Sequence, residues 1–545
     1  MALDPIAQLR AAVEAAASSL RNGGGSSLGA TLERPPKPDF GDYSSNAAML
    51  IAPTLGEQPR AIADRLAELL QERLADAVDR VEVAGPGFLN LFMADAWYRR
   101  TIADLVAAGE ELGRPEIGRE AESVLIEFVS ANPTGPLTAA GGRHAAYGDS
   151  IGRILEFIGD LVSREYYVND IGGQIERFAG SIAARMRGES PPEDGYEGAY
   201  VSELGERLAA EGVSPDDSER LERRGPELMR ADAEATLRRY GVEFDTWASE
   251  RELRDRGAVE RALADLREAG WAYEHEGATW LRTSALGDDK DRVLIRADGA
   301  PTYYMADIAY HRDKLERGAD RAIDVLGADH HGYTRRLKAA MTALDLDPDR
   351  LEISIMQLVH VVEGGERAQM SKRKGEFVTL DDLIDDIGAD AARFFMLQRS
   401  HDTPVDLDLE LARRTSNDNP VYYVQYAHAR TASILRKADE GTVAAALEGR
   451  DLPDRPLEPS ERALVRRLLE LPAEIGEAGA RRAPHRLCAY ATVTAADLHA
   501  FYRDCRVVGA EGEGVEAERI RLCVATARTI ARTLELLGIA APERM

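Results

Sequence analysis

Lysine and cysteine are scarce in this chain, and each shortage excludes something. The 545 residues include seven lysines against 95 acidic residues, so arginine supplies most of the positive charge and the net charge is −27. The three cysteines, Cys488, Cys505 and Cys523, lie near the end of the chain and form no C-x-x-C pair. This spacing indicates neither a disulfide framework nor a thiolate zinc site. We therefore expect a reducing compartment.

Long hydrophobic runs are also missing. The first twenty residues carry Asp4, Arg10 and Glu14 within their apolar pattern, and no later stretch reaches the roughly 18 uncharged apolar residues of a membrane span. We expect a cytoplasmic protein that does not enter a membrane. The hydrophobic share of 44% and the length predict several folded domains. The negative charge, taken alone, argues against a nucleic-acid partner.

Hydrophobic patterning divides the chain into three regions. Residues 1–112 predict a small α+β domain, with helices over 4–20 and 59–78 and strands at 81–83 and 88–92. Residues 113–410 alternate short buried strands with helices, which is typical of a parallel sheet with crossover helices, and a helical acidic insertion is expected at about 186–263. Residues 411–545 show only amphipathic helices. The predicted fold class is α/β with a C-terminal all-α bundle.

A loop rich in proline and glycine follows the first strand of the central region. Glu127 stands at the strand end, Pro133, Thr134 and Gly135 lie in the loop, and a helix is expected to open near Gly142. Backbone N–H groups and the positive end of a helix dipole could bind a phosphate there. An ordinary strand–helix turn explains the pattern equally well, and no Walker G-K-[ST] follows.

A second candidate is the basic segment QMSKRKG at residues 369–375, between a strand and a helix beginning near Leu380. An ammonium on a loop can stabilise negative charge that develops between two phosphates, an effect of about 2.7–4 kcal/mol by analogy with one oxyanion donor. A solvated basic turn would be the preferred interpretation if the segment stood alone.

Carboxylates and aromatic residues meet at two further places. Tyr303 and Asp307 are four residues apart at a predicted helix start and so share one face, which with Glu127 could form a pocket for a guanidinium. A capping aspartate and a half-buried tyrosine are the alternative. The triplet 329–331, Asp-His-His, resembles that of the DHH phosphoesterases, whose further aspartate motifs are missing here. A ligand-binding or structural pair is the better interpretation.

These residues belong to a series of motifs spread over essentially the whole chain. They are FGDY (40–43), GPGF (85–88), SANPTGP (130–136), YYVNDIGGQ (166–174), ADIAYHRDK (306–314), GADHHGY (327–333), QMSKRKG (369–375), DNPVYYVQYAHAR (418–430) and the final APERM. In this order they resemble the arginyl-tRNA synthetases, a family of class I aminoacyl-tRNA synthetases. Another possible function, a different nucleotidyl-transfer or metal phosphoesterase enzyme that uses the Asp-His-His triplet, finds no support elsewhere in the chain.

The resemblance implies a Rossmann-type catalytic domain and a two-step reaction. Arginine and ATP, with Mg²⁺, form arginyl-adenylate, and the arginyl group passes to the terminal adenosine of tRNA(Arg). A monomer without structural zinc is implied, whose N-terminal domain contacts the tRNA elbow and whose helical bundle binds the anticodon. By the same resemblance the arginine-binding residues are Glu127, Asn132, Tyr303, Asp307 and His330, and the ATP-binding residues are Pro133, Thr134, Gly135, Gly141, Gly142, Gln369, Met370, Ser371 and Lys372.

The family's H-x-G-H motif is absent. Its place is taken by residues 138–141, Thr-Ala-Ala-Gly, and the only nearby imidazole is His144. We hypothesise that Thr138, the N–H groups of Gly141 and Gly142, and His144 take over phosphate binding, while Lys372 acts catalytically. An unchanged activation rate in His144→Ala would remove His144 from that role. The alternative is a synthetase-like binding protein that has lost catalysis.

Two expectations concern tRNA and salt. The densest basic run of the bundle supplies the candidate tRNA contacts Arg466, Arg467, Arg481, Arg482 and Arg486, although a solvated face explains it nearly as well. The acidity with scarce lysine is typical of a halophilic protein. At 1 M salt the Debye length is about 3 Å, so long-range repulsion of RNA almost disappears. Best activity in dilute buffer and loss in molar KCl would refute this hypothesis.

Overall fold

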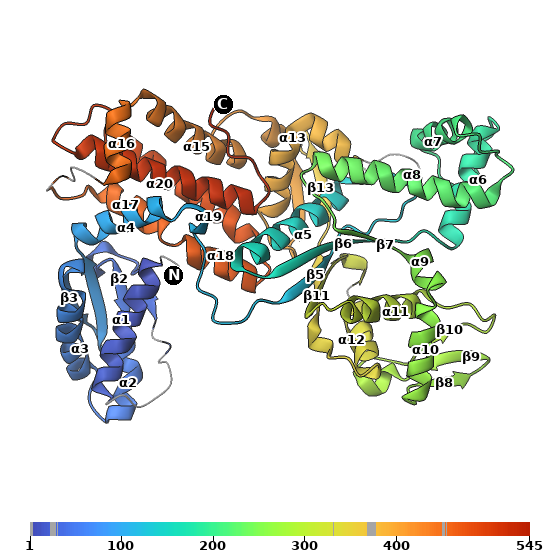
Figure 1. Cartoon of the computed structure of the whole chain (residues 1–545), viewed down its shortest axis with the longest axis horizontal. Coiled ribbons are helices and arrows are strands. Elements are labelled where there is room, and N and C mark those ends of the chain that lie inside the picture. Colours follow the sequence, from blue (N-terminus) through green and yellow to red (C-terminus); the bar gives the residue numbers. More distant parts are fainter. Residues whose placement is uncertain are drawn as a thin grey trace.

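The computed structural model describes residues 4–21, 29, 31–330, 332–367, 378–449, 453 and 455–545. Three regions follow one another along the chain (Figure 1). A small N-terminal α+β region lies beside a C-terminal helical region, and a central parallel sheet carries two insertions at the far end of the molecule. None of the helices in these described ranges is long and apolar enough to cross a membrane.

The N-terminal region is an antiparallel sheet covered by helices. Its strands stand in the order β1 (Leu32–Glu33), β2 (Tyr43–Ser45), β4 (Phe88–Met93) and β3 (Val78–Ala84), with helices α1 (Pro5–Leu20), α2 (Ala47–Leu55), α3 (Pro59–Leu74) and α4 (Asp95–Ala107). Helix α3 ends four residues before the predicted Val78, because Ala75 leaves the helical conformation with φ 47°. Gly41 is required where β2 begins. Its φ is +87°, and a Cβ there would lie 2.6 Å from the carbonyl oxygen of Leu91.

The central sheet is parallel throughout, as the strand–helix alternation predicts. Its order is β12 (Leu351–Met356), β11 (Arg321–Gly327), β5 (Ser123–Glu127), β6 (Leu161–Val168) and β7 (Thr246–Ser249). The chain leaves β5 through α5 (Ala139–Ile158) toward β6, while β11 lies on the other side of β5. The strand order therefore reverses between β5 and β11. In sheets of this kind, ligands bind outside the carboxyl ends of the strands at such a point.

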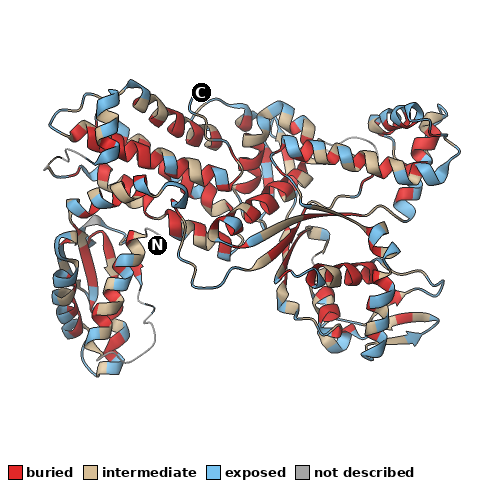
Figure 2. Cartoon of the chain, viewed as in Figure 1, coloured by how far each residue is buried: buried red, intermediate tan, exposed pale blue. Residues whose placement is uncertain are grey.

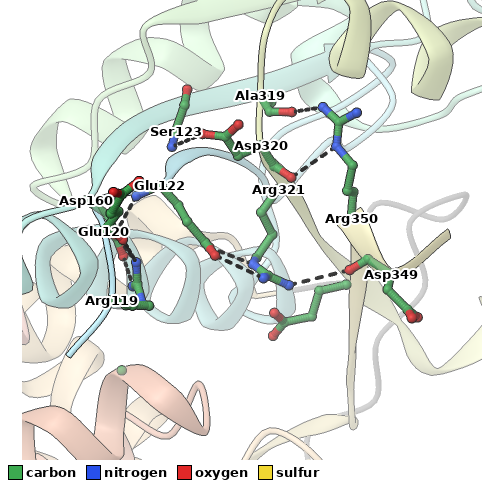
Figure 3. Close-up of polar contacts among 12 residues, drawn as sticks. Arg119, Glu120, Glu122, Ser123, Asp160, Ala319, Asp320, Arg321, Asp349 and Arg350 are labelled. Atoms are coloured by element: carbon green, nitrogen blue, oxygen red, sulfur yellow. Dashed lines mark hydrogen bonds and ion pairs between the residues drawn. The ribbon is translucent and has the colours of Figure 1, made fainter. Parts of the chain in front are cut away.

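The opposite, amino-terminal edge of this sheet is fastened by ion pairs (Figure 3). The guanidinium of Arg321 donates to both oxygens of Glu122 at 2.9 and 3.2 Å, and the backbone N–H of Ser123 donates to Asp320 at 2.8 Å. Because these contacts join the starts of β5 and β11, they fix the two strands relative to each other. This edge holds the scaffold and leaves the carboxyl edge free for a site.

The insertion differs from the prediction. A first, helical insertion separates β6 from β7 and consists of α6 (Gly173–Met186), α7 (Ala199–Ala210) and α8 (Ser218–Arg239). A second insertion lies between β7 and α11 (Tyr303–Glu316). It consists of α9 (Glu250–Asp255), α10 (Ala258–Glu268) and the antiparallel strands β8 (Ala272–His275), β9 (Ala278–Leu281) and β10 (Arg292–Ile295). The predicted single insertion at 186–263 therefore contains a strand of the central sheet, β7. This strand has four half-buried residues at the sheet edge and no apolar run that patterning could detect.

The remainder is mostly helical, and its core surrounds the last helix (Figure 2). Beyond β12, strand β13 (Val359–Glu363) pairs with β14 (Glu366–Arg367) and β15 (Val405–Asp408) in a second sheet. The helices are α12 (Tyr333–Ala343), α13 (Leu380–Leu397), α14 (Leu409–Arg413), α15 (Pro420–Lys437), α16 (Glu440–Glu448), α17 (Pro459–Leu468), α18 (Leu471–Ala480), α19 (His485–Asp504) and α20 (Val515–Leu536). Gly538 follows the C-cap residue Leu537 with φ +66°, a conformation typical of glycine after a helix end.

Candidate active site

A cavity of about 120 Å³ lies where the sheet order reverses. It is lined by Glu127 from the end of β5, by Tyr303 and Asp307 from α11, and by His330 and Tyr333 beyond β11. The structure thus brings together four of the five predicted arginine-binding residues. The fifth, Asn132, lies on the adjoining loop and does not line this cavity.

The start of α11 places Tyr303 and Asp307 on the cavity wall. Thr302 is the N-cap, and its hydroxyl accepts a hydrogen bond from the backbone N–H of Met305 at 3.3 Å. The two side chains then point the same way because they are four residues apart on the helix. Tyr303 is 51% exposed and Asp307 only 7%. The tyrosine therefore stands at the mouth and the carboxylate at the base.

Among the described residues Asp307 makes no ion pair, and the buried imidazole of His311, which lowers its pKa, is itself paired with Asp324 at 2.5 Å. Burial raises the pKa of Asp307 to about 7, although a hydrogen bond donated by the Tyr333 hydroxyl opposes part of this shift. Its protonated and ionised forms are thus close in free energy near neutral pH. A cation entering the cavity would favour the ionised form.

Glu127, in contrast, already has a cationic partner. The fully buried ammonium of Lys314 contacts Glu127 and lies 2.7 Å from Asp324, and the Ser130 hydroxyl donates to Glu127 at 2.7 Å. Burial alone would lower the pKa of Lys314, but these two carboxylates raise it above its usual range. Because Lys314 balances Glu127, Asp307 is the carboxylate that a bound cation would meet. The sequence shows no sign of this cluster.

The loop after β5 leaves the strand through a strained turn. Val129 and Ser130 have φ of +70° and +39°, a region that side chains rarely adopt. Ser130 is held there, since its hydroxyl donates to Glu127 and accepts from the backbone N–H of Tyr167 at 3.1 Å. The amide of Asn132 donates to Gln174 at 2.8 Å. The predicted ATP-binding residues Pro133, Thr134 and Gly135 follow on this loop.

Helix α5 opens three residues before the predicted position. Thr138 is its N-cap, and its hydroxyl accepts from the N–H of Gly141 at 3.3 Å while its carbonyl accepts from the N–H of Gly142 at 3.1 Å. The hypothesis assigned both N–H groups to a phosphate. In the structure both already bond to Thr138, so these two groups could bind a phosphate only by breaking a hydrogen bond, whereas the helix dipole acts without such a loss.

His144 lies in the wall of the cavity and is uncharged. Burial, together with the neighbouring Arg143, lowers the pKa of His144 to about 4. It therefore offers no positive charge to a phosphate at neutral pH. Arg143 is itself fully buried and donates to the carbonyls of Gln357 and Ser400 at 2.8 and 2.9 Å, which ties α5 to the second sheet. Sequence reasoning missed this structural arginine.

Several predicted site residues lie outside the described residues. These are Gln369, Met370, Ser371 and Lys372, together with His331 of the Asp-His-His triplet. Beyond that basic segment, the carbonyl of Val378 accepts from the N–H of Ala139 at 3.1 Å, and the N–H of Leu380 donates to Leu137 at 2.8 Å. The described chain thus resumes directly beside the start of α5. Among the described residues, no group of three or more His, Cys, Asp or Glu could hold a metal ion.

The predicted tRNA-contacting arginines are mostly engaged within the protein. All five make ion pairs, and four of the partners lie in other elements: Arg466 pairs with Asp42, Arg467 with Asp497, Arg482 with Glu352 and Arg486 with Glu474. Arg481, with 69% of its side chain exposed, pairs with Glu477 in its own helix. Arg466 connects the helical region to the N-terminal region, and Arg482 connects it to the central sheet. Two of the five arginines therefore join regions, and the other three pair within the helical region.

A basic and aromatic groove in the helical region was missed. It has a volume of about 880 Å³ and is lined by Tyr426 and Arg430 of α15, by Tyr502 and Arg503 of α19, and by the last residues of the chain, including Met545. The guanidinium of Arg430 lies 5.0 Å from the ring centre of Tyr426 and 4.7 Å from that of Tyr502. Tyr426 and Arg430 are four residues apart, a spacing that could have revealed the pair.

Comparisons with known proteins agree with this arrangement of regions. Residues 7–93 match the arginyl tRNA synthetase N-terminal domain, residues 231–417 the catalytic domain of class I (R) tRNA synthetases, and residues 424–545 the DALR anticodon binding domain. Among solved structures, a Campylobacter jejuni protein assigned to arginyl-tRNA synthetase is 33% identical, with 83% of this chain and 100% of that one covered and a TM-score of 0.77.

Two further structures extend the likeness over the whole chain. The Thermus thermophilus arginyl-tRNA synthetase is 26% identical, covering 99% of this chain and all of its own, with a TM-score of 0.75. The Plasmodium falciparum enzyme shares the fold at 16% identity, with 99% of each chain covered and a TM-score of 0.74. The chain therefore belongs to the arginyl-tRNA synthetase family of class I aminoacyl-tRNA synthetases.

Proposed function

We propose that the cavity between β5, β11 and α11 binds arginine, with the guanidinium at Asp307. As a member of its family the chain is an arginine–tRNA ligase, which attaches arginine to tRNA and uses ATP. The observation that carries the assignment is a buried carboxylate, Asp307, that makes no ion pair among the described residues, whereas the fully buried Lys314 pairs with its neighbour Glu127. A planar guanidinium can be held bidentately by such a carboxylate, with Tyr303 over the mouth.

ATP would then lie over the loop 133–135 and the start of α5. This proposal is supported by the dipole of α5, whose N-cap is Thr138, and by the return of the described chain at Val378 beside this helix start. We assign Lys372 to the phosphates, where an ammonium would stabilise developing charge. Mg²⁺ would accompany ATP as part of the substrate. The neutral His144 would act only through hydrogen bonds.

The arginine site can be tested by its response to pH. Below pH 7, arginine must displace a proton from Asp307, because the free carboxyl has a pKa of about 7 and the bound guanidinium favours the ionised form. The Kd for arginine should therefore rise by up to about tenfold per pH unit below pH 7 and level off above it. Calorimetry in buffers of different ionisation heat should show proton release approaching one per arginine at pH 6. Affinity that does not change between pH 6 and 8 would contradict the assignment.

The proposal for tRNA places the anticodon in the groove of Tyr426, Arg430 and Tyr502. Unpaired bases stack on aromatic rings, and a guanidinium between two rings holds both and attracts the backbone. Stacking of this kind is worth about 1–3 kcal/mol per base. The chain's monomeric working state and the elbow contact of the N-terminal region belong to the same proposal.

Tyr426→Ala should weaken tRNA binding about 5- to 150-fold, as the stacking energy implies. Filter binding at a fixed salt concentration measures it, and arginine affinity should not change because the groove is remote from the cavity. Arg481→Ala is the matched control, since Arg481 is an exposed arginine of the same helical region paired only with Glu477. If Arg481→Ala lowered tRNA affinity more than Tyr426→Ala, the groove proposal would be contradicted and the basic run would be the better candidate for the tRNA contact.

A further inference from the structure

The helical insertion touches the loop that follows β5 at two places. The hydroxyl of Tyr200, near the start of α7, donates to the backbone carbonyl of Thr134 at 2.9 Å. At the start of α6, the side chain of Gln174 accepts from the amide of Asn132 at 2.8 Å. Both contacts come from the insertion, which lies at the end of the molecule beyond β6 and β7 (Figure 1). They reach residues that the resemblance assigns to arginine and to ATP.

Tyr200 is fixed by the insertion's own core. Its ring stacks on Phe178 of α6, with ring centres 6.5 Å apart and an angle of 28° between the planes, and Phe178 is fully buried. Phe178 also meets Tyr196 edge-on at 5.3 Å. The direction of the Tyr200 hydroxyl therefore depends on how α6 and α7 pack together.

The loop lies directly against this tyrosine. A Cβ added to Gly135 would lie 3.2 Å from the Tyr200 hydroxyl oxygen and 3.4 Å from the ring carbon that bears it. The glycine thus permits a close approach that a side chain would disturb. One hydrogen bond and one packing contact together set the distance between insertion and loop.

We propose that Tyr200 is a positioning residue, through which the insertion holds the loop from Asn132 to Gly135 in place for arginine and ATP. The inference rests on the proposed function of that loop. The helical insertion would then act in substrate positioning, because displacement of the loop by a fraction of an ångström would misalign both substrates.

The test compares Tyr200→Phe with Tyr196→Phe. Each removes one hydroxyl from the same aromatic cluster, but only Tyr200 donates to the loop. In arginine-dependent ATP–pyrophosphate exchange, Tyr200→Phe should raise the KM for arginine and ATP, lowering kcat/KM about two- to tenfold, the effect of one neutral hydrogen bond. A purely structural loss would reduce the amount of active protein and leave both KM values unchanged.

A second variant tests the packing contact. Gly135→Ala should cost more in the wild type than in the Tyr200→Phe background, because loss of the hydroxyl makes room for the methyl group. We expect the fall in kcat/KM caused by Gly135→Ala to be at least about twofold larger in the wild type than in Tyr200→Phe. Equal costs in the two backgrounds would overturn the proposal.

Hydrogen exchange of residues 131–137 gives a readout without activity. The exchange rate of these amides should be higher in Tyr200→Phe than in the wild type and should equal the wild-type rate in Tyr196→Phe. Unchanged exchange in both variants would contradict the positioning role whatever the kinetics show. If the wild type showed no activity but hydrogen exchange were faster in Tyr200→Phe, the proposed function of the loop would be contradicted. The role of Tyr200 in holding the loop would still be supported.

Discussion

Asp307→Asn should reduce kcat/KM for arginine by about 10²–10⁴. The substitution keeps the size of the side chain and a hydrogen-bond acceptor for Tyr333, but it leaves the guanidinium without its buried counter-charge. Loss of one partner of a buried ion pair costs about 3–5 kcal/mol, and each 1.36 kcal/mol is a factor of ten. Steady-state exchange kinetics with arginine as the varied substrate measure the effect. The stability of the fold should change little, because the protonated, uncharged form of Asp307 is already well populated at neutral pH in the free protein.

The control for this variant is Asp329→Asn. Asp329 lies next to the cavity residue His330, but 83% of its side chain is exposed. Its removal should change kcat/KM for arginine by less than about threefold, the range of a screened surface charge. The KM for ATP should stay within twofold in both variants. A similar fall in kcat/KM for arginine in the two variants would mean that Asp307 does not hold the guanidinium. A rise in the KM for ATP as large as that for arginine in Asp307→Asn would mean the same.

Lys314→Met should lower the free energy of unfolding of the central region by about 3–5 kcal/mol. The ammonium is fully buried between Glu127 and Asp324, so its loss leaves Glu127 without a cation and Asp324 with the His311 imidazole alone. Glu127 would then compete with Asp307 for the arginine side chain or become protonated. Chemical denaturation followed by tryptophan fluorescence measures the stability, and calorimetry measures arginine binding.

Lys338→Met is the matched control for Lys314→Met. Lys338 pairs with Asp349 at 3.3 Å, with side-chain exposures of 37% and 88%, and a pair of this kind is worth about 0–1 kcal/mol. The same chemical change should therefore be nearly silent at position 338. If Lys314→Met unfolds at the same denaturant concentration as Lys338→Met, the buried cluster does not stabilise the site.

Sequence patterning predicts the central sheet because buried strands are visible as continuous apolar runs. Strand β5 contains such a run and β11 is mostly apolar apart from Arg321 and Asp324, whereas β7 is short and half-buried and lies inside a charge-rich stretch, so it was missed. The pair Tyr303 and Asp307 could be read from helical spacing alone. The partnership of Lys314 with Glu127 could not, since 187 residues separate them.

The ion-paired arginines show the same limit. Arg466 and Arg482 look like a basic surface in sequence, yet their partners Asp42 and Glu352 come from other regions of the chain. Local pattern cannot distinguish a solvated cation from one whose carboxylate arrives through folding. The groove of Tyr426 and Arg430 was predictable in part, because both stand on one helix at a spacing of four.

The acidity still awaits a test of its own. A net charge of −27 on a tRNA-binding protein is most easily reconciled with concentrated salt, where long-range repulsion is screened. Buried pairs such as Lys314 with Asp324 are screened far less than exposed ones. The halophilic origin therefore remains a prediction that the salt dependence of activity will decide.

The most direct test of the account is arginine-dependent ATP–pyrophosphate exchange, measured with and without tRNA from dilute buffer to molar KCl. The central claim is that this chain activates arginine although Thr138 and Gly141 stand where histidines are expected. The account predicts exchange that requires arginine, is strongest in concentrated KCl, and falls about 10²–10³-fold in Lys372→Ala, as for the loss of one oxyanion donor. No exchange under any of these conditions, in protein that still binds arginine and tRNA, would contradict it.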